Sequence, residues 1–352
     1  MSDARAVLKR SIRGFRTQSD AAAAILLLFD VLLFSALLGT VLVARSGAVK
    51  LVAATFVGLS IARLFVIGHD ACHQSFFSDR RWNRWIGRFA FLPSLTTYSL
   101  WEAGHNLGHH VFTNLRGRDY VWTPFSKAEF DALPAVRRAL ERFYRSGVGF
   151  GAYYLIELWW RKLMFPTRAE LPGRKPVHVW DSLFVSAFAA IWIAAVAVVA
   201  VVTSQSVGQV VFFAFFWPTL VWTVLMGAVI YLHHTHPRLQ WYVDLDLWEA
   251  ARDGVSSTVH VTFAPGLDWL LNNIMIHPAH HLDVRVPLYR LDPAQRSLDD
   301  AGATAVEQRF SFRYAWDTLK RCKLYDYGER RWMDFAGRYT SDARPVHADD
   351  RA

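Results

Sequence analysis

Histidine is the residue of this sequence whose spacing most clearly predicts chemistry. Eleven of the fourteen histidines gather in four short clusters. The clusters are His69 with His73, then His105, His109 and His110, then His233, His234 and His236, and finally His277, His280 and His281. Histidines that merely fill a protein core would be scattered along the chain. Because neutral imidazole is a common metal ligand, the clusters predict a metal site.

The spacing inside the clusters favours two metal ions. Residues four apart on an α-helix project from the same face, and three pairs have that spacing: His69/His73, His105/His109 and His277/His281. His110 and His280 add a neighbour on the adjoining side of the same face. With one further ligand from 233–236, there are more imidazoles than the four ligands of a tetrahedral zinc site. They suit two metals with room left for oxygen.

Other histidine-containing sites fit less well. The His-Glu-x-x-His string of zinc proteases is absent. A ferritin-like bundle needs Glu-x-x-His twice, and only Glu102 with His105 has that spacing. A haem protein or a metal transporter would place its ligands within the apolar runs, whereas these clusters follow the runs. The remaining histidines, His178, His260 and His347, are expected to be structural or to lie at the surface.

Four apolar runs are each long enough to cross a bilayer, which takes about 20 helical residues. They cover residues 21–44, 49–68, 179–202 and 207–232. The stretches 82–101 and 147–165 are aromatic and apolar but interrupted by charges, so we expect interfacial or partly re-entrant helices there. Asp30, inside the first run, is expected to make a polar contact between helices. Arg63 is expected to extend to the membrane surface.

The distribution of basic residues predicts the topology. Net charge is +9, and nearly all Lys and Arg lie at the N-terminus or after the second and fourth apolar runs. Since positive segments stay inside, both termini and all four histidine clusters are expected to be cytosolic, in regions 1–20, 69–178 and 233–352. We therefore predict an all-α membrane protein with one domain, 1–352, in which four spans carry a cytosolic helical cap that holds the metal site.

Composition argues against several other classes of protein. No basic module interleaved with aromatic residues is visible, so a nucleic-acid partner is not expected. The two cysteines, Cys72 and Cys322, have no paired spacing and are expected to be reduced thiols facing the cytosol. Arg far outnumbers Lys, as in GC-rich bacterial genomes, which favours the bacterial inner (plasma) membrane as the location.

The histidine strings HDACH, HNLGHH and HPAHH resemble the three boxes of the integral-membrane fatty acid desaturase and hydroxylase superfamily. The resemblance runs from about 60 to 292. The strings HDACHQSFFSDRRWN, YLHHTHP and HHLDVRVPLYRL are most similar to acyl-lipid delta-12/omega-6-like desaturases. Two departures stand out. The second box has three residues between its first two histidines where two are usual, and His233 stands where glutamine is common.

The resemblance implies an oxygen-dependent oxidoreductase with two iron ions that introduces a double bond into a lipid-linked acyl chain. The eight box histidines would be iron ligands, with a ninth from His234 or His236; His236 is ranked marginally first and His233 is expected to lie outside the ligand shell. Hydroxylation, decarboxylation, and carotenoid or alkane oxidation on the same centre stay open as alternatives. A non-catalytic metal-binding membrane protein is a further alternative from another class.

Carboxylates and amides near the boxes are expected to orient the imidazoles through their second nitrogen, or else to serve as surface or capping residues. These residues are Asp70, Asn106, Asp119, Asn273 and Asp283. Trp101 and Glu102 are expected to border the substrate slot. No flavin, nicotinamide, iron–sulfur or haem motif is present. The expected partners are therefore a membrane lipid or fatty acyl substrate and an external donor, a ferredoxin or a cytochrome b5-like protein with its reductase.

Overall fold

The computed structural model describes residues 3–303 and 305–342. Within them, four helices are long and apolar enough to cross a membrane. They are α2 (Asp20–Val43), α3 (Gly47–Cys72), α10 (Pro176–Val202) and the segment Val207–His234, which comprises α11 (Val207–Val211), the π-helix η4 (Phe212–Phe216) and α12 (Trp217–His234). The four predicted spans are confirmed. Two of them run further than predicted, so that His69 and His234 lie in the last turns of α3 and α12.

Local sequence explains where these helices begin. Ser19, Ser46 and Ser206 are N-caps whose hydroxyl oxygens accept hydrogen bonds from backbone N–H groups of the first turns of α2, α3 and α11. Such caps satisfy donors that have no partner within the helix. Proline opens α10 at Pro176, where its missing N–H costs nothing. The two hairpin turns are therefore encoded by short polar segments between apolar runs.

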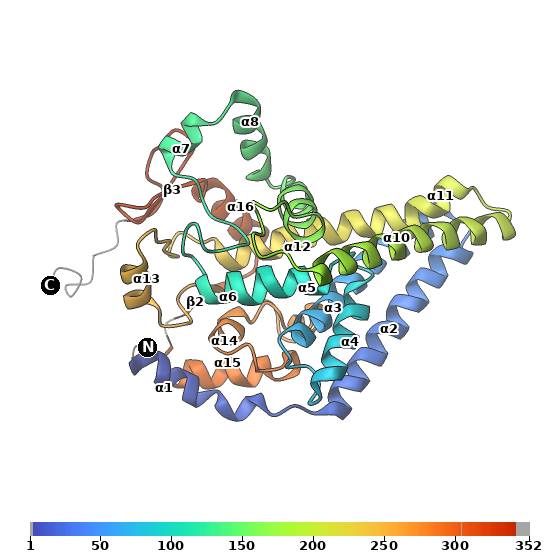
Figure 1. The fold of residues 1–352 in the computed structure, drawn as a ribbon, viewed down its shortest axis with the longest axis horizontal. Coiled ribbons are helices and arrows are strands. Elements are labelled where there is room, and N and C mark those ends of the chain that lie inside the picture. Colours follow the sequence, from blue (N-terminus) through green and yellow to red (C-terminus); the bar gives the residue numbers. More distant parts are fainter. Residues whose placement is uncertain (1–2, 304, 343–352) are drawn as a thin grey trace.

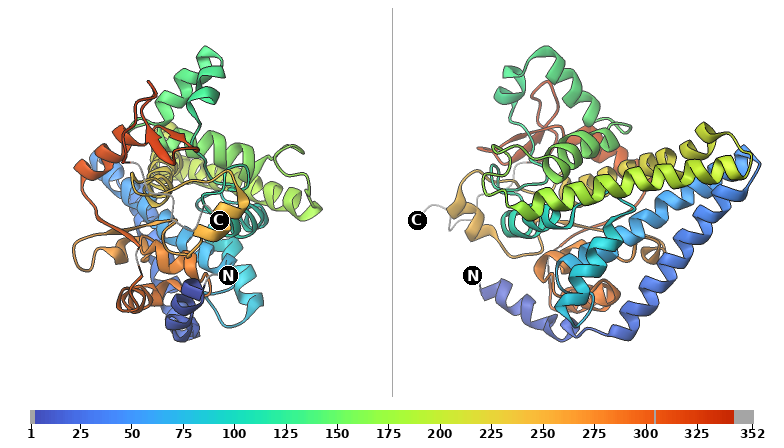
Figure 2. Two further views of the ribbon diagram at one scale, coloured as in Figure 1. Left: turned by 90° about the vertical axis from the view of Figure 1, so that its left-hand side faces the viewer. Right: turned by 45° about the vertical axis from the view of Figure 1, so that its right-hand side comes forward.

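The long helices form two hairpins that converge at their tips, and the other elements gather at the opposite end (Figure 1; Figure 2, right). Arg45 Nη1 donates to Ser204 O over 3.3 Å, and Gln205 Nε2 donates to Leu42 O over 2.7 Å, which ties the tips together. The apolar window of α3 is 72% buried, against 11% for α2 and 22% for α10. The helix α3 is thus an inner helix, whereas α2 and α10 face the surroundings.

A buried ion pair joins α2 to α3. Asp30 Oδ1 lies 2.5 Å from Arg63 Nε, and Asn272 Nδ2 donates to Asp30 Oδ2 over 3.0 Å. The polar contact expected for Asp30 is therefore confirmed. The expectation that Arg63 reaches the membrane surface was wrong: its side chain is 4% exposed, and its guanidinium lies 4.3 Å from the centre of the Trp269 ring. Pairing removes the cost of leaving either charge alone in an apolar layer.

The aromatic stretches between the second and third spans form helices. The first contains α4 (Arg80–Phe91) and α5 (Tyr98–Trp101), and the second contains α9 (Phe150–Tyr153) and the π-helix η3 (Tyr154–Met164). Trp82 and Trp85 on α4 and Trp160 on η3 are more than half exposed. Exposed tryptophan is typical of the lipid headgroup level. The position of these helices at the membrane surface stays a prediction.

The remaining elements surround the inner ends of the spans and add two small sheets to an otherwise helical fold. Strand β1 (Val259–Thr262) pairs in parallel with β2 (Val306–Arg309), and β3 (Leu324–Asp326) pairs antiparallel with β4 (Arg331–Met333). The other helices are α1 (Asp3–Ser11), η1 (Arg13–Arg16), η2 (Glu102–His109), α6 (His110–Phe112), α7 (Lys127–Ala132), α8 (Ala135–Tyr144), α13 (Leu245–Ala251), η5 (Asp268–Leu271), α14 (His277–Leu282), η6 (Leu288–Arg290), α15 (Leu291–Asp300) and α16 (Phe312–Arg321).

Candidate metal centre

Nine histidines from four distant segments meet where α3 and α12 end, away from the tips of the hairpins. They form two groups, and within each group the ligand nitrogens lie within 4.8 Å of one another. The five-histidine group consists of His69, His73, His105, His110 and His280. The four-histidine group consists of His109, His234, His277 and His281. All nine rings are buried except His110, which is partly buried.

The helix type around the second box decides which ring joins which group. Residues Glu102–His109 form a π-helix, η2, and the His110 N–H donates to His105 O. In a π-helix the backbone hydrogen bonds join residues five apart, and His105 and His110, which are joined in this way, lie in the same group. His109 belongs to the other one. Of the three pairs spaced four residues apart, His69/His73 and His277/His281 each share a group, whereas the rings of His105 and His109 stack at 5.3 Å but lie in different groups.

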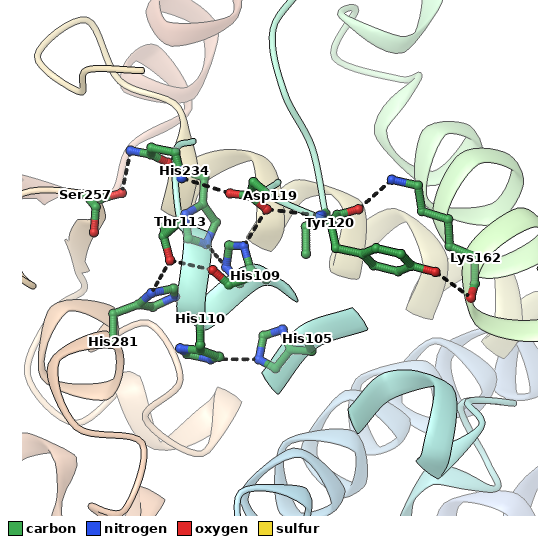
Figure 3. Close-up of polar contacts among 12 residues, drawn as sticks. His105, His109, His110, Thr113, Asp119, Tyr120, Lys162, His234, Ser257 and His281 are labelled. Carbon is green, nitrogen blue, oxygen red and sulfur yellow. Dashed lines mark hydrogen bonds and ion pairs between the residues drawn. The ribbon is translucent and has the colours of Figure 1, made fainter. Parts of the chain in front are cut away.

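Two glycines let a tyrosine pack closely against η2. A Cβ atom on Gly104 would lie 2.4 Å from the Tyr120 ring, and one on Gly108 would lie 2.8 Å from the Tyr120 Cβ. Tyr120 is held by Lys162 of η3, because its hydroxyl donates to Lys162 O over 3.1 Å and Lys162 Nζ donates to Tyr120 O over 2.5 Å (Figure 3). This clamp fixes the π-helix, and with it the second box, against η3.

The ring nitrogens face one another at distances that suit shared metal ions. In the five-histidine group, His105 Nε2 lies 2.8 Å from His69 Nε2 and 3.0 Å from His110 Nε2. In the four-histidine group, His234 Nε2 lies 3.2 Å from His109 Nε2 and 3.1 Å from His277 Nε2. Neighbouring imidazoles at metal–nitrogen distances of about 2.0–2.1 Å have nitrogens about 3 Å apart. The residues present therefore fit two metal ions.

Burial keeps the imidazoles in the form that binds metal. Desolvation, followed by the nearby imidazoles, lowers the pKa of His73, His105 and His110 well below its ordinary value. The same causes lower the pKa of His277 and His281. These rings are neutral at physiological pH, and only the neutral ring has a lone pair for a metal.

Asp119 and Thr113 orient rings of the four-histidine group (Figure 3). Asp119 Oδ1 accepts from His109 Nδ1 over 2.8 Å, which directs His109 Nε2 toward the group. The carboxylate is itself held by the N–H groups of Asn114 and Val121. Thr113 Oγ1 lies 3.3 Å from His281 Nδ1. Asp119 was expected in this role from the sequence, whereas Thr113 was not, because its only sequence signal is its place three residues after the second box.

Of the third cluster, His234 lies in the four-histidine group, whereas the higher-ranked His236 lies outside both groups. The helix α12 ends at His234, and Thr235 is extended, so His236 turns away; its Nδ1 accepts from Arg238 N over 3.0 Å. His233 stacks on His277 at 3.7 Å and its Nε2 lies 3.1 Å from Met275 Sδ, outside both groups as expected. His178 and His260 also lie outside both groups, and His347 lies outside the described residues.

The other four residues expected to orient imidazoles lie in different environments. Asp70 Oδ1 lies 3.7 Å from His69 Nδ1, while its Oδ2 accepts from Leu288 N. The others bond elsewhere within the described residues: Asn106 donates to Cys72 O, Asn273 donates to Leu288 O, and Asp283 pairs with Arg16 and Arg285. Their contacts tie loops and chain segments together rather than hold a clustered ring.

An apolar cavity of about 60 Å³ reaches both groups from between the spans. Its walls include Ala62 and Phe65 of α3 together with Met226 and Val229 of α12. At its inner end lie histidines of both groups: His69, His105, His109, His234 and His277. Trp101 lines the cavity as expected and stacks on His105 at 4.5 Å, whereas Glu102 is exposed and does not line it. The cavity has room for a few methylene groups of a hydrocarbon chain beside the clustered histidines.

Comparison with known proteins agrees with this geometry. The family model for fatty acid desaturases matches residues 46–313. The chain is 32% identical to an "sn-1 oleoyl-lipid 12-desaturase" of Picosynechococcus sp., over 79% of this chain and 77% of that protein. It is 31% identical to the protein of the same name from Synechocystis sp., over 76% and 74%. An "Omega-6 fatty acid desaturase, chloroplastic" of Glycine max is 28% identical, over 76% and 61%. The chain belongs to the fatty acid desaturase family and is a membrane oxidoreductase.

Proposed function

We propose that the protein is an oxygen-dependent di-iron desaturase. It introduces a second double bond, at position 12, into an oleoyl chain of a membrane glycerolipid. The observation that carries the proposal is the apolar cavity that ends on histidines of both groups. The relatives named sn-1 oleoyl-lipid 12-desaturases support the substrate and the bond position. We assign one iron to each histidine group. An all-imidazole shell suits iron, among other metals.

The reaction balances only with electrons from outside. A –CH2–CH2– unit loses two hydrogen atoms, and O2 with two further electrons and two protons becomes two waters. Bound iron supplies the oxygen chemistry. The chain supplies position: α3 and α12 hold the methylene pair beside His69 and His109 and exclude water from it. Holding reacting atoms in place can provide much of the rate enhancement.

We infer that the active site faces the cytosol of a bacterial inner membrane. The basic segments after the second and fourth spans support this orientation. The electrons then come from a cytosolic carrier, a ferredoxin or a cytochrome b5-like protein with its reductase. In the fold, His69 and His234 lie at the inner ends of their spans, away from the tips of the hairpins.

Lipid analysis of an expressing host tests the proposed reaction. A host whose lipids contain oleoyl chains should accumulate the doubly unsaturated chain when it expresses the protein with an electron carrier. The matched control is the His109→Ala variant, which should produce none. An alcohol or a terminal alkene in place of the new double bond would show that the centre hydroxylates or decarboxylates instead.

Metal analysis tests the cofactor separately. The purified protein should contain about two iron ions per chain, one for each group of imidazoles. Zinc as the only bound metal would contradict the proposed chemistry, because zinc has no redox states to offer.

A further inference from the structure

A second, larger cavity reaches the histidines through a different set of residues. It measures about 570 Å³, and His110 of the five-histidine group and His281 of the four-histidine group lie in its wall. It shares no lining residue with the apolar cavity. Its wall comes mainly from α1, α13 and the segments around 110–114 and 238–257, with single residues from α14 and β2 and none from the membrane-spanning helices. We call it the basic cleft.

The charged residues of the basic cleft are almost all cations. Arg5, Arg238, Arg252 and Arg330 line it, against one carboxylate, Asp253. Asp253 Oδ1 already accepts from the N–H groups of Val255 and Ser256 and from the Ser256 hydroxyl. Burial lowers the pKa of Arg252 to about 10, so it remains cationic at neutral pH. The cleft therefore has a positive field that selects an anionic partner.

Short bonded paths lead from the wall of the basic cleft to both histidine groups. Trp248 Nε1 donates to Thr113 O over 2.8 Å, and Thr113 Oγ1 lies 3.3 Å from His281 Nδ1 (Figure 3). Arg252 Nη2 donates to His110 O over 3.3 Å, and its guanidinium lies 4.6 Å from the centre of the Trp248 ring. A redox group seated in the cleft would thus be one or two residues from ligands of each proposed iron.

We propose that the basic cleft is the docking surface for a small acidic electron-carrier protein, which delivers electrons through the His110 and His281 side of the metal centre. The inference rests on the proposed function, because only a redox centre needs a carrier. In each transfer the reduced iron–sulfur or haem group of the carrier loses one electron and the metal centre gains it. Two transfers complete one turnover with O2, two protons and the –CH2–CH2– unit.

The position of the basic cleft favours a soluble protein over a lipid headgroup. A headgroup would approach along the spanning helices, and none of them lines the cleft. The apolar cavity between α3 and α12 already provides that approach for lipid. Electrostatic complementarity of this kind acts mainly on the rate of association.

Charge reversal tests the docking surface in the purified, iron-loaded protein. The variant Arg238→Glu/Arg330→Glu should raise KM about tenfold for an acidic plant-type ferredoxin kept reduced by its reductase and NADPH. Its kcat should change little. The wild-type KM should rise with salt, and the KM of the variant should respond less. Calorimetry provides a readout that needs no turnover: the affinity of the purified protein for the oxidised ferredoxin should fall about tenfold in the double variant. Both measurements are repeated with the soluble domain of an acidic cytochrome b5.

The matched control is Arg168→Glu, because Arg168 is exposed and lies outside the cleft; its KM should stay at the wild-type value. A second readout replaces the carrier with dithionite, a small reductant that needs no docking, and here the double variant should match the wild type. An unchanged KM in the double variant, an equal rise with Arg168→Glu, or a loss of binding to anionic vesicles alone overturns the docking inference. The docking inference is also overturned if the wild-type protein turns over with dithionite but with neither carrier.

Failure of the proposed function gives a different result. In that case the wild-type protein forms no double bond with either carrier or with dithionite, and the docking inference falls with it. Turnover with dithionite alone therefore separates a wrong docking surface from a wrong reaction.

Discussion

Single histidines have distinct places in the two ligand groups, and substitution tests each place. His109→Ala and His280→Ala each remove one candidate ligand, from the four-histidine and the five-histidine group respectively. Both variants should lose turnover and bind less metal, because a buried site with a missing ligand holds its ion weakly. Metal content of the purified variants and lipid analysis are the measurements. His178→Ala should change neither quantity, since His178 lies outside both groups; a loss of metal there would contradict the assignment.

The Asp119 carboxylate, which accepts a hydrogen bond from His109, should raise the metal affinity of the four-histidine group without being a ligand. Asp119→Ala leaves His109 Nδ1 without its acceptor, and such substitutions typically lower metal affinity or activity about 10- to 100-fold. Metal-binding titrations of the metal-free variant measure the loss. Asp283→Asn is the comparison, because among the described residues Asp283 pairs with arginines and bonds no clustered ring. Equal losses in both variants would argue against a specific role for Asp119.

Most of the candidate ligands could be predicted from residue type and spacing, but their distribution over two groups could not. The split of the second box depends on a π-helix, and the contact that accompanies it, Tyr120 against Gly104, joins residues sixteen positions apart. The choice of His234 over His236 depends on where α12 ends. The sequence places both histidines within three residues, and only the backbone conformation at Thr235 separates them.

Among the elements, α2 and α3 depend on one buried ion pair. Asp30→Ala would leave the Arg63 charge buried without its partner, and breaking such a pair typically costs about 3–5 kcal/mol. Thermal unfolding in detergent should show the loss. The double variant Asp30→Ala/Arg63→Leu removes both charges and should recover part of that stability. Additive losses in the double variant would show that the pair contributes little.

The spans were predictable because apolar runs of that length have few alternatives in a membrane protein. Which spans are buried was harder to predict from the sequence. The helix α3 is largely buried while α2 is not, although both runs are strongly apolar. Arg63 shows the reason. A charge near a helix end can reach the surface or meet a partner, and the partner, Asp30, lies thirty-three residues away.

For the whole molecule, the buried imidazoles predict how the metal-free protein responds to pH. Burial lowers the pKa of His73, His105 and His280 well below 6.5, whereas unfolded histidines titrate near 6.5. Between the two values the unfolded chain binds more protons, so stability should fall as pH drops below about 6.5 and stay level above it.

Thermal unfolding of the metal-free protein in detergent, from about pH 5 to 8, measures this dependence on histidine protonation. The His280→Asn variant should show a shallower fall in stability, because it has one fewer buried imidazole. A stability profile that is flat below pH 6.5 in the wild-type protein would contradict the assigned protonation states.

Adjacent residues in the chain connect the two histidine groups. His109 and His110 are consecutive and belong to different groups, as do His280 and His281. Their ring centres lie 5.5 and 5.8 Å apart, and consecutive Cα atoms keep a fixed separation of about 3.8 Å. The peptide bond between two adjacent histidines thus limits the distance between the two groups, and it does so at two places. We therefore expect bending of the spans in a thicker or thinner bilayer to move both groups together and to change the gap between them little.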